Sequence, residues 1–176
     1  MAAGVRSFVC TRLRRVRGPM QSWGGSPQEI AFVVTAPGVV VDGIVAFGAG
    51  PYARHGLVDV ELQLYDGGPG GTPSERTLLA SGAAHSSQQR LITCLLGRPA
   101  ALQAGREYTL VAHVSGHDTE FGCGGTRVVA APCSVTFIFK DVRRSGNLTS
   151  FEGGQFQAVL FHLEDALESG DGDGEM

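Results

Sequence analysis

Residues 147–163 read Asn-Leu-Thr-Ser-Phe-Glu-Gly-Gly-Gln-Phe-Gln-Ala-Val-Leu-Phe-His-Leu. The first part, residues 147–155, is polar and contains two glycines, as is typical of a turn-forming loop. The second part, residues 156–163, is an apolar run with the alternation of a closing β-strand. No catalytic motif of comparable quality occurs elsewhere in the sequence. The stretch therefore favours a β-rich protein that binds rather than one that catalyses.

Apolar residues recur with period two along the chain. In residues 58–64, four apolar residues alternate with Asp59, Glu61 and Gln63, which predicts a strand with one dry and one wet face. Residues 39–46 are nearly continuous apolar around Asp42-Gly43, which predicts a buried strand kinked at a bulge. The expected strands are residues 30–34, 39–46, 58–64, 77–80, 90–96, 108–114, 135–139 and 156–163. With 26 glycines for turns, this pattern predicts an all-β fold, an antiparallel β-sandwich.

The length of 176 residues fits one domain, which buries roughly 70% of its unfolded surface. We expect a flexible N-terminus at residues 1–7, a single sandwich at residues 8–163 and a disordered acidic tail at residues 164–176. Residues 66–73, rich in glycine and proline, are expected to be an exposed loop. Residues 99–105 are expected to connect two strands.

The start of the chain is basic. Residues 1–28 hold no acid and five arginines: Arg6, Arg12, Arg14, Arg15 and Arg17. The plainest interpretation is a first strand beginning at Ser7, with solvated arginines; a mitochondrial transit peptide is the alternative. The net charge is −3, and five arginines without a basic fold face attract phosphate only weakly. Nucleic acid is therefore not expected as a partner.

Membrane and compartment signals are sparse. No stretch approaches the ~18 continuous apolar residues of a membrane span, so no membrane partner is expected. The four cysteines form no Cys-x-x-Cys pair, and no hydrophobic signal-peptide core follows the N-terminal arginines. These features predict reduced, mostly buried thiols in a cytoplasmic protein. Asn147 begins an Asn-Leu-Thr sequon, which we interpret as a turn.

Sites for catalysis and cofactors are not predicted. The only lysine, Lys140, follows a strand without the glycine loop that a phosphate-binding motif needs. No Gly-x-Ser-x-Gly elbow occurs, and the neighbours His85 and Ser86 would point to opposite faces of an extended chain. A zinc site is the most tempting alternative, although its spacing is too loose for a zinc knuckle. Its ligands would be His113, His117, Cys123 and Cys133. We expect no cofactor, no metal and no enzymatic activity.

Four blocks of sequence, in this order, resemble the PHR domain, a module of Highwire-type ubiquitin ligases and of BTB-domain adaptor proteins. The blocks are Trp23-Gly24 with Ser26-Pro27 before residues 30–34; Val41 to Gly48; Ser115 to Gly125 before residues 135–139; and Asn147-x-Thr149 with Gly154-Gln155. The chain departs from the family pattern at Leu148, where glycine is usual, and at Phe156-Gln157, where Ile-Pro is usual. These departures fall in loops that could form a binding surface.

The resemblance implies a PHR-like, jelly-roll-like antiparallel β-sandwich that acts as a non-catalytic protein-interaction module. Its partners would be components, substrates or regulators of ubiquitin ligases. Three loops hold the groups best suited to binding, with Tyr52, Phe121 and Arg127 as anchors because aromatic residues and arginine dominate interface energetics. The candidate residues are Tyr52, Arg54 and His55 in residues 50–56; Asp118, Glu120, Phe121 and Arg127 in residues 117–127; and Asn147, Thr149 and Gln155 in residues 147–155.

Other interpretations of these residues stay open. Phe121 could plug the end of the core, and Asn147 and Thr149 could stabilise their own turn, since such side chains bond readily to nearby backbone. A sandwich that binds a small ligand or a carbohydrate is the alternative function. One tryptophan and one asparagine give it few groups for stacking on, and bonding to, a sugar.

Overall fold

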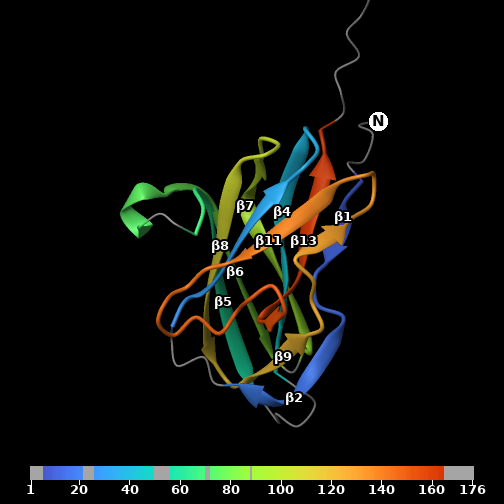
Figure 1. Ribbon diagram of the computed structural model, residues 1–176. Coiled ribbons are helices and arrows are strands. Elements are labelled where there is room, and N and C mark those ends of the chain that lie inside the picture. The colour runs from blue at the N-terminus through green and yellow to red at the C-terminus, as the bar shows by residue number, and fades with distance from the viewer. Residues whose placement is uncertain (1–5, 22–25, 50–55, 70–71, 88, 165–176) are drawn as a thin grey trace, which may run out of the picture.

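The computed structural model describes residues 6–21, 26–49, 56–69, 72–87 and 89–164. Its strands pair antiparallel in three sheets (Figure 1). The four-stranded sheet has the order β1 (Phe8–Thr11), β13 (Phe156–Leu163), β4 (Val39–Phe47), β7 (Leu91–Ala101). The six-stranded sheet has the order β10 (Val128–Ala130), β11 (Thr136–Asp141), β3 (Gln28–Val34), β8 (Glu107–Gly116), β5 (Leu57–Asp66), β6 (Thr77–Ser87). The small sheet has the order β12 (Gly153–Gly154), β9 (Thr119–Cys123), β2 (Arg15–Gln21), and a single 3-10 turn spans Pro73–Glu75.

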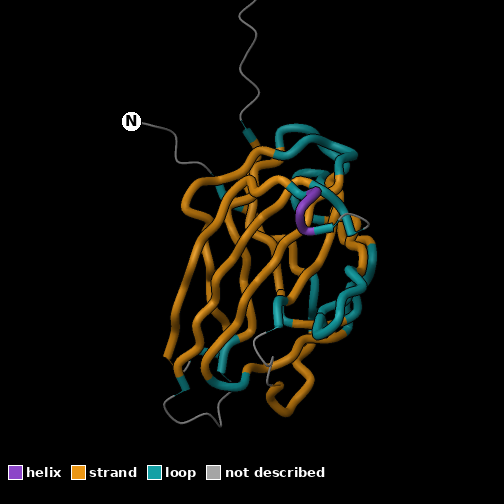
Figure 2. Tube along the Cα trace, turned by 90° about the vertical axis from the view of Figure 1, so that its left-hand side faces the viewer, coloured by secondary structure: helices purple, strands orange, loops and turns teal. Residues whose placement is uncertain are grey.

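The core lies between the four-stranded and the six-stranded sheets. Phe137 of β11 and Phe161 of β13 meet across it, with ring centroids 5.3 Å apart. Phe32 of β3 adds a further ring beside Phe137, and all three side chains are fully buried. Figure 2 shows the strands running along the length of the molecule, with loops gathered along one side and at the ends. The predicted antiparallel β-sandwich is confirmed.

Strands with a clear apolar pattern form where the sequence predicts them. The four apolar residues of 58–64 are fully buried in β5, whereas Asp59 and Glu61 are exposed. β13 has the predicted bounds, Phe156–Leu163. The expectation that the departure at Phe156-Gln157 falls in a loop is therefore wrong, since both residues lie in this strand and Phe156 is buried. The bulge in β4 is confirmed as well, because the register skips Asp42 in the pairing with both β13 and β7. Asp42 thereby reaches His162, whose Nδ1 lies 2.8 Å from its Oδ1.

Several strands differ from the prediction. β6 continues to Ser87, and β7 includes residues 99–101, which we had expected in a connection. Both are edge strands, and their added residues, 81–87 in β6 and 97–101 in β7, are mostly small or polar, so these parts carry no apolar alternation. Gly82 explains how they approach each other, because a Cβ there would lie 1.9 Å from the carbonyl oxygen of Leu95. Backbone pairing, rather than apolar pattern, determines these two strands.

Candidate partner-binding surface

Two segments distant in sequence form one ribbon at an end of the sandwich. Residues 122–123 of β9 pair with Gly153 and Gly154 of β12. Beyond the pair, the amide of Gly125 donates to the carbonyl of Glu152 over 3.1 Å. The expectation of a loop over residues 117–127 is therefore wrong for residues 119–123, which form a strand between β2 and β12. The ribbon brings the second and third predicted binding loops together.

A groove of about 420 Å³ opens on this ribbon. We call it the glycine groove; it is lined by Arg17, Phe121, Cys123, Gly124, Gly125, Ser150, Glu152 and Gly153. A Cβ at Gly125 would lie 2.1 Å from the carbonyl oxygen of Phe151, and one at Gly153 would lie 2.9 Å from the ring of Phe121. Larger residues at these positions would therefore push the two segments apart.

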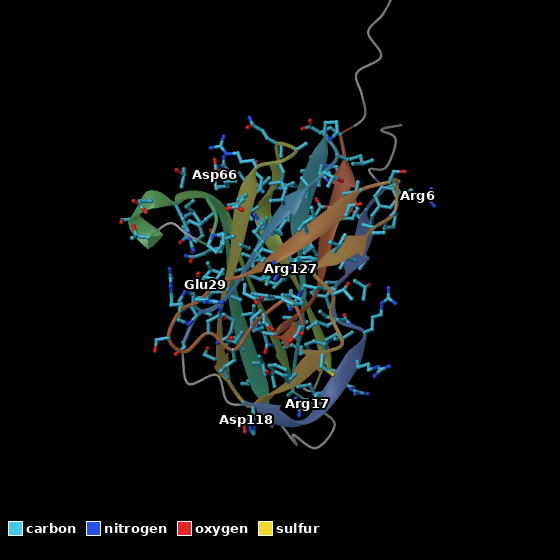
Figure 3. All side chains as sticks on the ribbon, viewed as in Figure 1. Arg6, Arg17, Glu29, Asp66, Asp118 and Arg127 are labelled. Atoms are coloured by element: carbon cyan, nitrogen blue, oxygen red, sulfur yellow. The ribbon has the colours of Figure 1, made fainter. Side chains whose placement is uncertain are left out.

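Chemically distinct groups line the groove. Phe121 is half-buried and supplies an aromatic side chain to the lining. Arg17 and Glu152 are exposed and supply charges of opposite sign. In Figure 3, Arg17 and Asp118 lie at the same end of the molecule, and Arg127 lies nearer its middle. The groove can therefore contact an apolar side chain and charged groups of either sign.

Arg12 fixes the loop that forms one wall of the groove. Its side chain is buried and donates to the carbonyls of Ser150, Phe151 and Phe156; the bond from Nη2 to Phe156 is 2.8 Å long. Burial lowers the pKa of the Arg12 guanidinium, and the negative charge of Asp141 counteracts this effect. An arginine keeps its proton at neutral pH even so. The loop is thus held by a buried positive charge.

Asn147 attaches the start of the same loop to β3. Its Oδ1 accepts from the amides of Glu29, at 3.0 Å, and of Thr149, at 3.1 Å. Its Nδ2 donates to the carbonyls of Glu29, at 3.0 Å, and of Val142, at 2.8 Å. These four bonds use both the oxygen and the nitrogen of the side-chain amide. The structure thus supports the interpretation of Asn147 as a turn-stabilising residue.

Thr149 and Gln155 continue this network into the interior. The Thr149 hydroxyl donates to Gln28 over 3.2 Å and accepts from the amide of Gln155 over 3.3 Å. Gln155 is fully buried; its Oε1 accepts from Thr119 over 2.8 Å, and its Nε2 donates to the carbonyl of Phe47. Neither side chain faces the solvent. Both side chains fix the conformation of the loop, and neither is available to contact a partner.

The remaining predicted site residues have varied positions. Glu120 is largely buried and forms a two-point ion pair with Arg90, at 3.0 and 3.2 Å. Asp118 is exposed in the turn between β8 and β9. Arg127 is exposed and lies over the Phe151 ring, 4.7 Å from its centroid. Three further residues lie outside the described part of the chain: Tyr52, Arg54 and His55.

The alternative zinc site finds no geometric support in the described residues. No three His, Cys, Asp or Glu side chains among them lie close enough to hold a metal ion. His113 is exposed on β8, as its place in the alternation predicts, and Cys133 is exposed in the turn before β11.

Within the described part of the chain, no helix is long and apolar enough to cross a membrane.

Comparison with known proteins identifies the family. The sequence model of the PHR domain matches residues 11–162. The chain is 30% identical over 129 residues to the E3 ubiquitin-protein ligase highwire of Drosophila melanogaster. This match includes 68% of the chain and 2% of that ligase. It is 28% identical over 125 residues to the E3 ubiquitin-protein ligase MYCBP2 of Danio rerio. This match includes 68% of the chain and 3% of the relative. The chain thus spans a small part of the length of these relatives. Fold, signature and family match agree: the chain belongs to the PHR domain family.

Proposed function

We propose that this PHR domain is a non-catalytic protein-interaction module that holds a substrate or regulator for a ubiquitin ligase. An extended segment of the partner would lie in the glycine groove. The link to ubiquitination rests on the relatives, both of which are named as E3 ubiquitin ligases. Rigid strands with binding groups on their connections are the usual arrangement of such modules.

The observation that carries the proposal is the composition of the groove. Its volume of about 420 Å³ is within the range of ligand sites, which hold roughly 300–1,000 Å³. Glycines in the wall let the two segments of this chain approach closely and so shape the groove. Phe121 lines the groove with an aromatic side chain, the residue type that often anchors interfaces, and the exposed Arg17 and Glu152 can pair with charges on the partner.

The test is capture of a partner followed by variants in the groove. The purified protein is cross-linked in cell extract, the captured protein is identified by mass spectrometry, and its Kd is measured. Glu152→Lys reverses an exposed charge in the groove, and Phe121→Ala removes the anchor. Each should raise Kd by about tenfold or more, the loss typical of an interface anchor.

Glu61→Lys provides the matched control, because Glu61 is also exposed but lies on β5 and does not line the groove. It should bind as the original chain does. If both groove variants bind like Glu61→Lys while circular dichroism shows them folded, the partner does not use this groove and the proposal fails.

The cytoplasmic location also remains a proposal. The four cysteines are free thiols, and Cys10 and Cys94 are buried, which suits a reducing compartment. Fractionation of cells that express the tagged chain tests it. Recovery in the mitochondrial fraction would instead favour the transit-peptide interpretation of the basic start.

A further inference from the structure

The outer face of the six-stranded sheet carries a second buried cluster, separate from the core. Glu29 of β3, Val111 of β8 and Gln63 of β5 are register partners and form one row across three adjacent strands. The next residues along these strands, such as Ile30 and Leu110, belong to the core on the opposite face. Glu29 is nevertheless fully buried, although its face of the sheet is turned away from the core.

Two arginines bind the buried carboxylate of Glu29. Arg76, which follows the 3-10 turn, donates from Nη1 to Oε2 of Glu29 over 2.9 Å. Arg144, from the loop after β11, donates from its Nη1 to the other carboxylate oxygen. Two guanidinium groups and one carboxylate leave this cluster with a net charge of +1. Glu29 and Arg76 are buried and the Arg144 side chain is 30% exposed, so the excess positive charge attracts one further negative charge.

Arg76 has unused donors at this position. Its side chain is 2% exposed, and its Nε and Nη2 have no hydrogen-bond partner in the described part of the chain. Nε and Nη2 lie on the same edge of the guanidinium group, where their N–H bonds point in parallel. This edge matches the two oxygens of a carboxylate, which it binds in a two-point contact. Buried donors without a partner are costly, so an occupant that accepts from both would be favoured.

A cavity of about 220 Å³ adjoins this group, with Arg76, Glu29 and Arg144 in its lining. Tyr65 and Gln63 complete one side and bond to each other over 3.0 Å. We propose that the cavity is a binding site for a carboxylate, which the free edge of Arg76 receives after a small shift of its side chain, because Nε and Nη2 are both closed to solvent in this structure. The single excess positive charge fits a monoanion. The carboxylate can come from a small organic acid or from the C-terminus of a peptide. The site shares no lining residue with the glycine groove, so the two proposals stand independently.

The experiment titrates the folded chain with sodium acetate against sodium chloride at equal ionic strength. Binding is followed by the Nε–Hε signals of assigned arginines in ¹⁵N NMR spectra and by isothermal titration calorimetry. Acetate should shift the Arg76 signal saturably and leave that of Arg106 unchanged, since Arg106 is exposed and already paired with Asp66. An Arg76 signal that does not respond to acetate overturns the proposal.

Variants separate the two-point contact from simple charge attraction. Arg76→Lys keeps a positive charge beside Glu29 but has no paired donors, so its Kd for acetate should rise about tenfold or more. Arg106→Lys is the matched control and should bind acetate as the original chain does. Unchanged binding by a folded Arg76→Lys variant would refute the role of the free edge. If Arg76→Lys does not fold, the Arg76 signal of the original chain still decides.

The source of the carboxylate is resolved with two tripeptides, one with a free C-terminus and one amidated. Tighter binding of the free tripeptide than of acetate, and none of the amidated form, assigns the site to a peptide terminus. Equal binding of acetate and free tripeptide assigns it to small organic acids. Inorganic phosphate that binds more tightly than either carboxylate would overturn the assignment to a carboxylate.

Discussion

Replacing Arg12 with methionine tests whether one buried charge holds the wall of the glycine groove. The side chain is 2% exposed and donates to three carbonyls, those of Ser150, Phe151 and Phe156. Methionine fills a similar volume along the stem but donates no hydrogen bond. The substitution therefore leaves the buried carbonyl of Phe156 and the partly buried carbonyls of Ser150 and Phe151 without this donor.

The expected loss of stability follows from two opposing effects. Each hydrogen bond from a charged donor contributes about 1.5–3 kcal/mol. The substitution also removes the cost of burying the guanidinium, several kcal/mol, which offsets more than half of that loss. A net fall of about 3 kcal/mol in the free energy of unfolding is expected from the bonds that are lost after this offset.

Urea denaturation measures this difference. With a slope of about 2 kcal/mol per molar urea, the midpoint should fall by about 1.5 M. Arg14→Met is the matched control, because Arg14 is exposed two residues away and should change the midpoint little. Hydrogen exchange should also quicken at the amides of Ser150 and Gly125, which bond within the ribbon. Equal midpoints for the two variants would refute the role assigned to Arg12.

Three further predictions concern the thiols, a glycine and the loop anchor. Burial raises the pKa of Cys10 to about 12 and that of Cys94 to about 11, so at pH 8 a thiol reagent should label exposed Cys133 well before either. Since the unfolded thiols lose their protons near pH 8.5, the free energy of unfolding should be highest below that pH and fall as the pH rises toward 11; rapid labelling of Cys10 in folded protein would contradict this. Gly43→Ala should destabilise the fold by about 2 kcal/mol or more in urea, because its Cβ would lie 2.3 Å from the carbonyl oxygen of Cys94, and a midpoint equal to that of the original chain would count against the register of β4. Asn147→Ala loses four hydrogen bonds and should cost about 2–3 kcal/mol by thermal unfolding, whereas a free surface residue would cost almost nothing.

The strands that the sequence predicts are those whose two faces differ in environment. In β5, burial on one face and solvent on the other select apolar and polar residues in turn, so the pattern is visible locally. The β4 bulge is visible for a similar reason, since Asp42-Gly43 interrupts an apolar run. The signature at Asn147 is legible because an amide side chain that bonds to nearby backbone has a strong preference for turns.

The parts that the sequence does not predict depend on contacts between distant residues. β9 pairs with an arginine-rich strand and a two-residue strand, so no apolar alternation marks it. In the sequence, Arg12 cannot be told from the other four arginines of residues 1–28. Only its contacts with residues 150–156 distinguish it. Arg76 and Glu29 are 47 positions apart, and no spacing rule connects them. Residues 50–55 fall outside the described part of the chain, so the role of Tyr52 remains a prediction.

The network of Asn147, Thr149 and Gln155 bears on how kinship is interpreted in this family. The residues by which the domain is recognised in sequence form hydrogen bonds within the chain. Selection on them therefore acts through folding. Two members of the family can therefore share these residues and still bind different partners. Under the proposed function, differences in partner between members would be expected at Arg17, Phe121 and Glu152, which line the glycine groove.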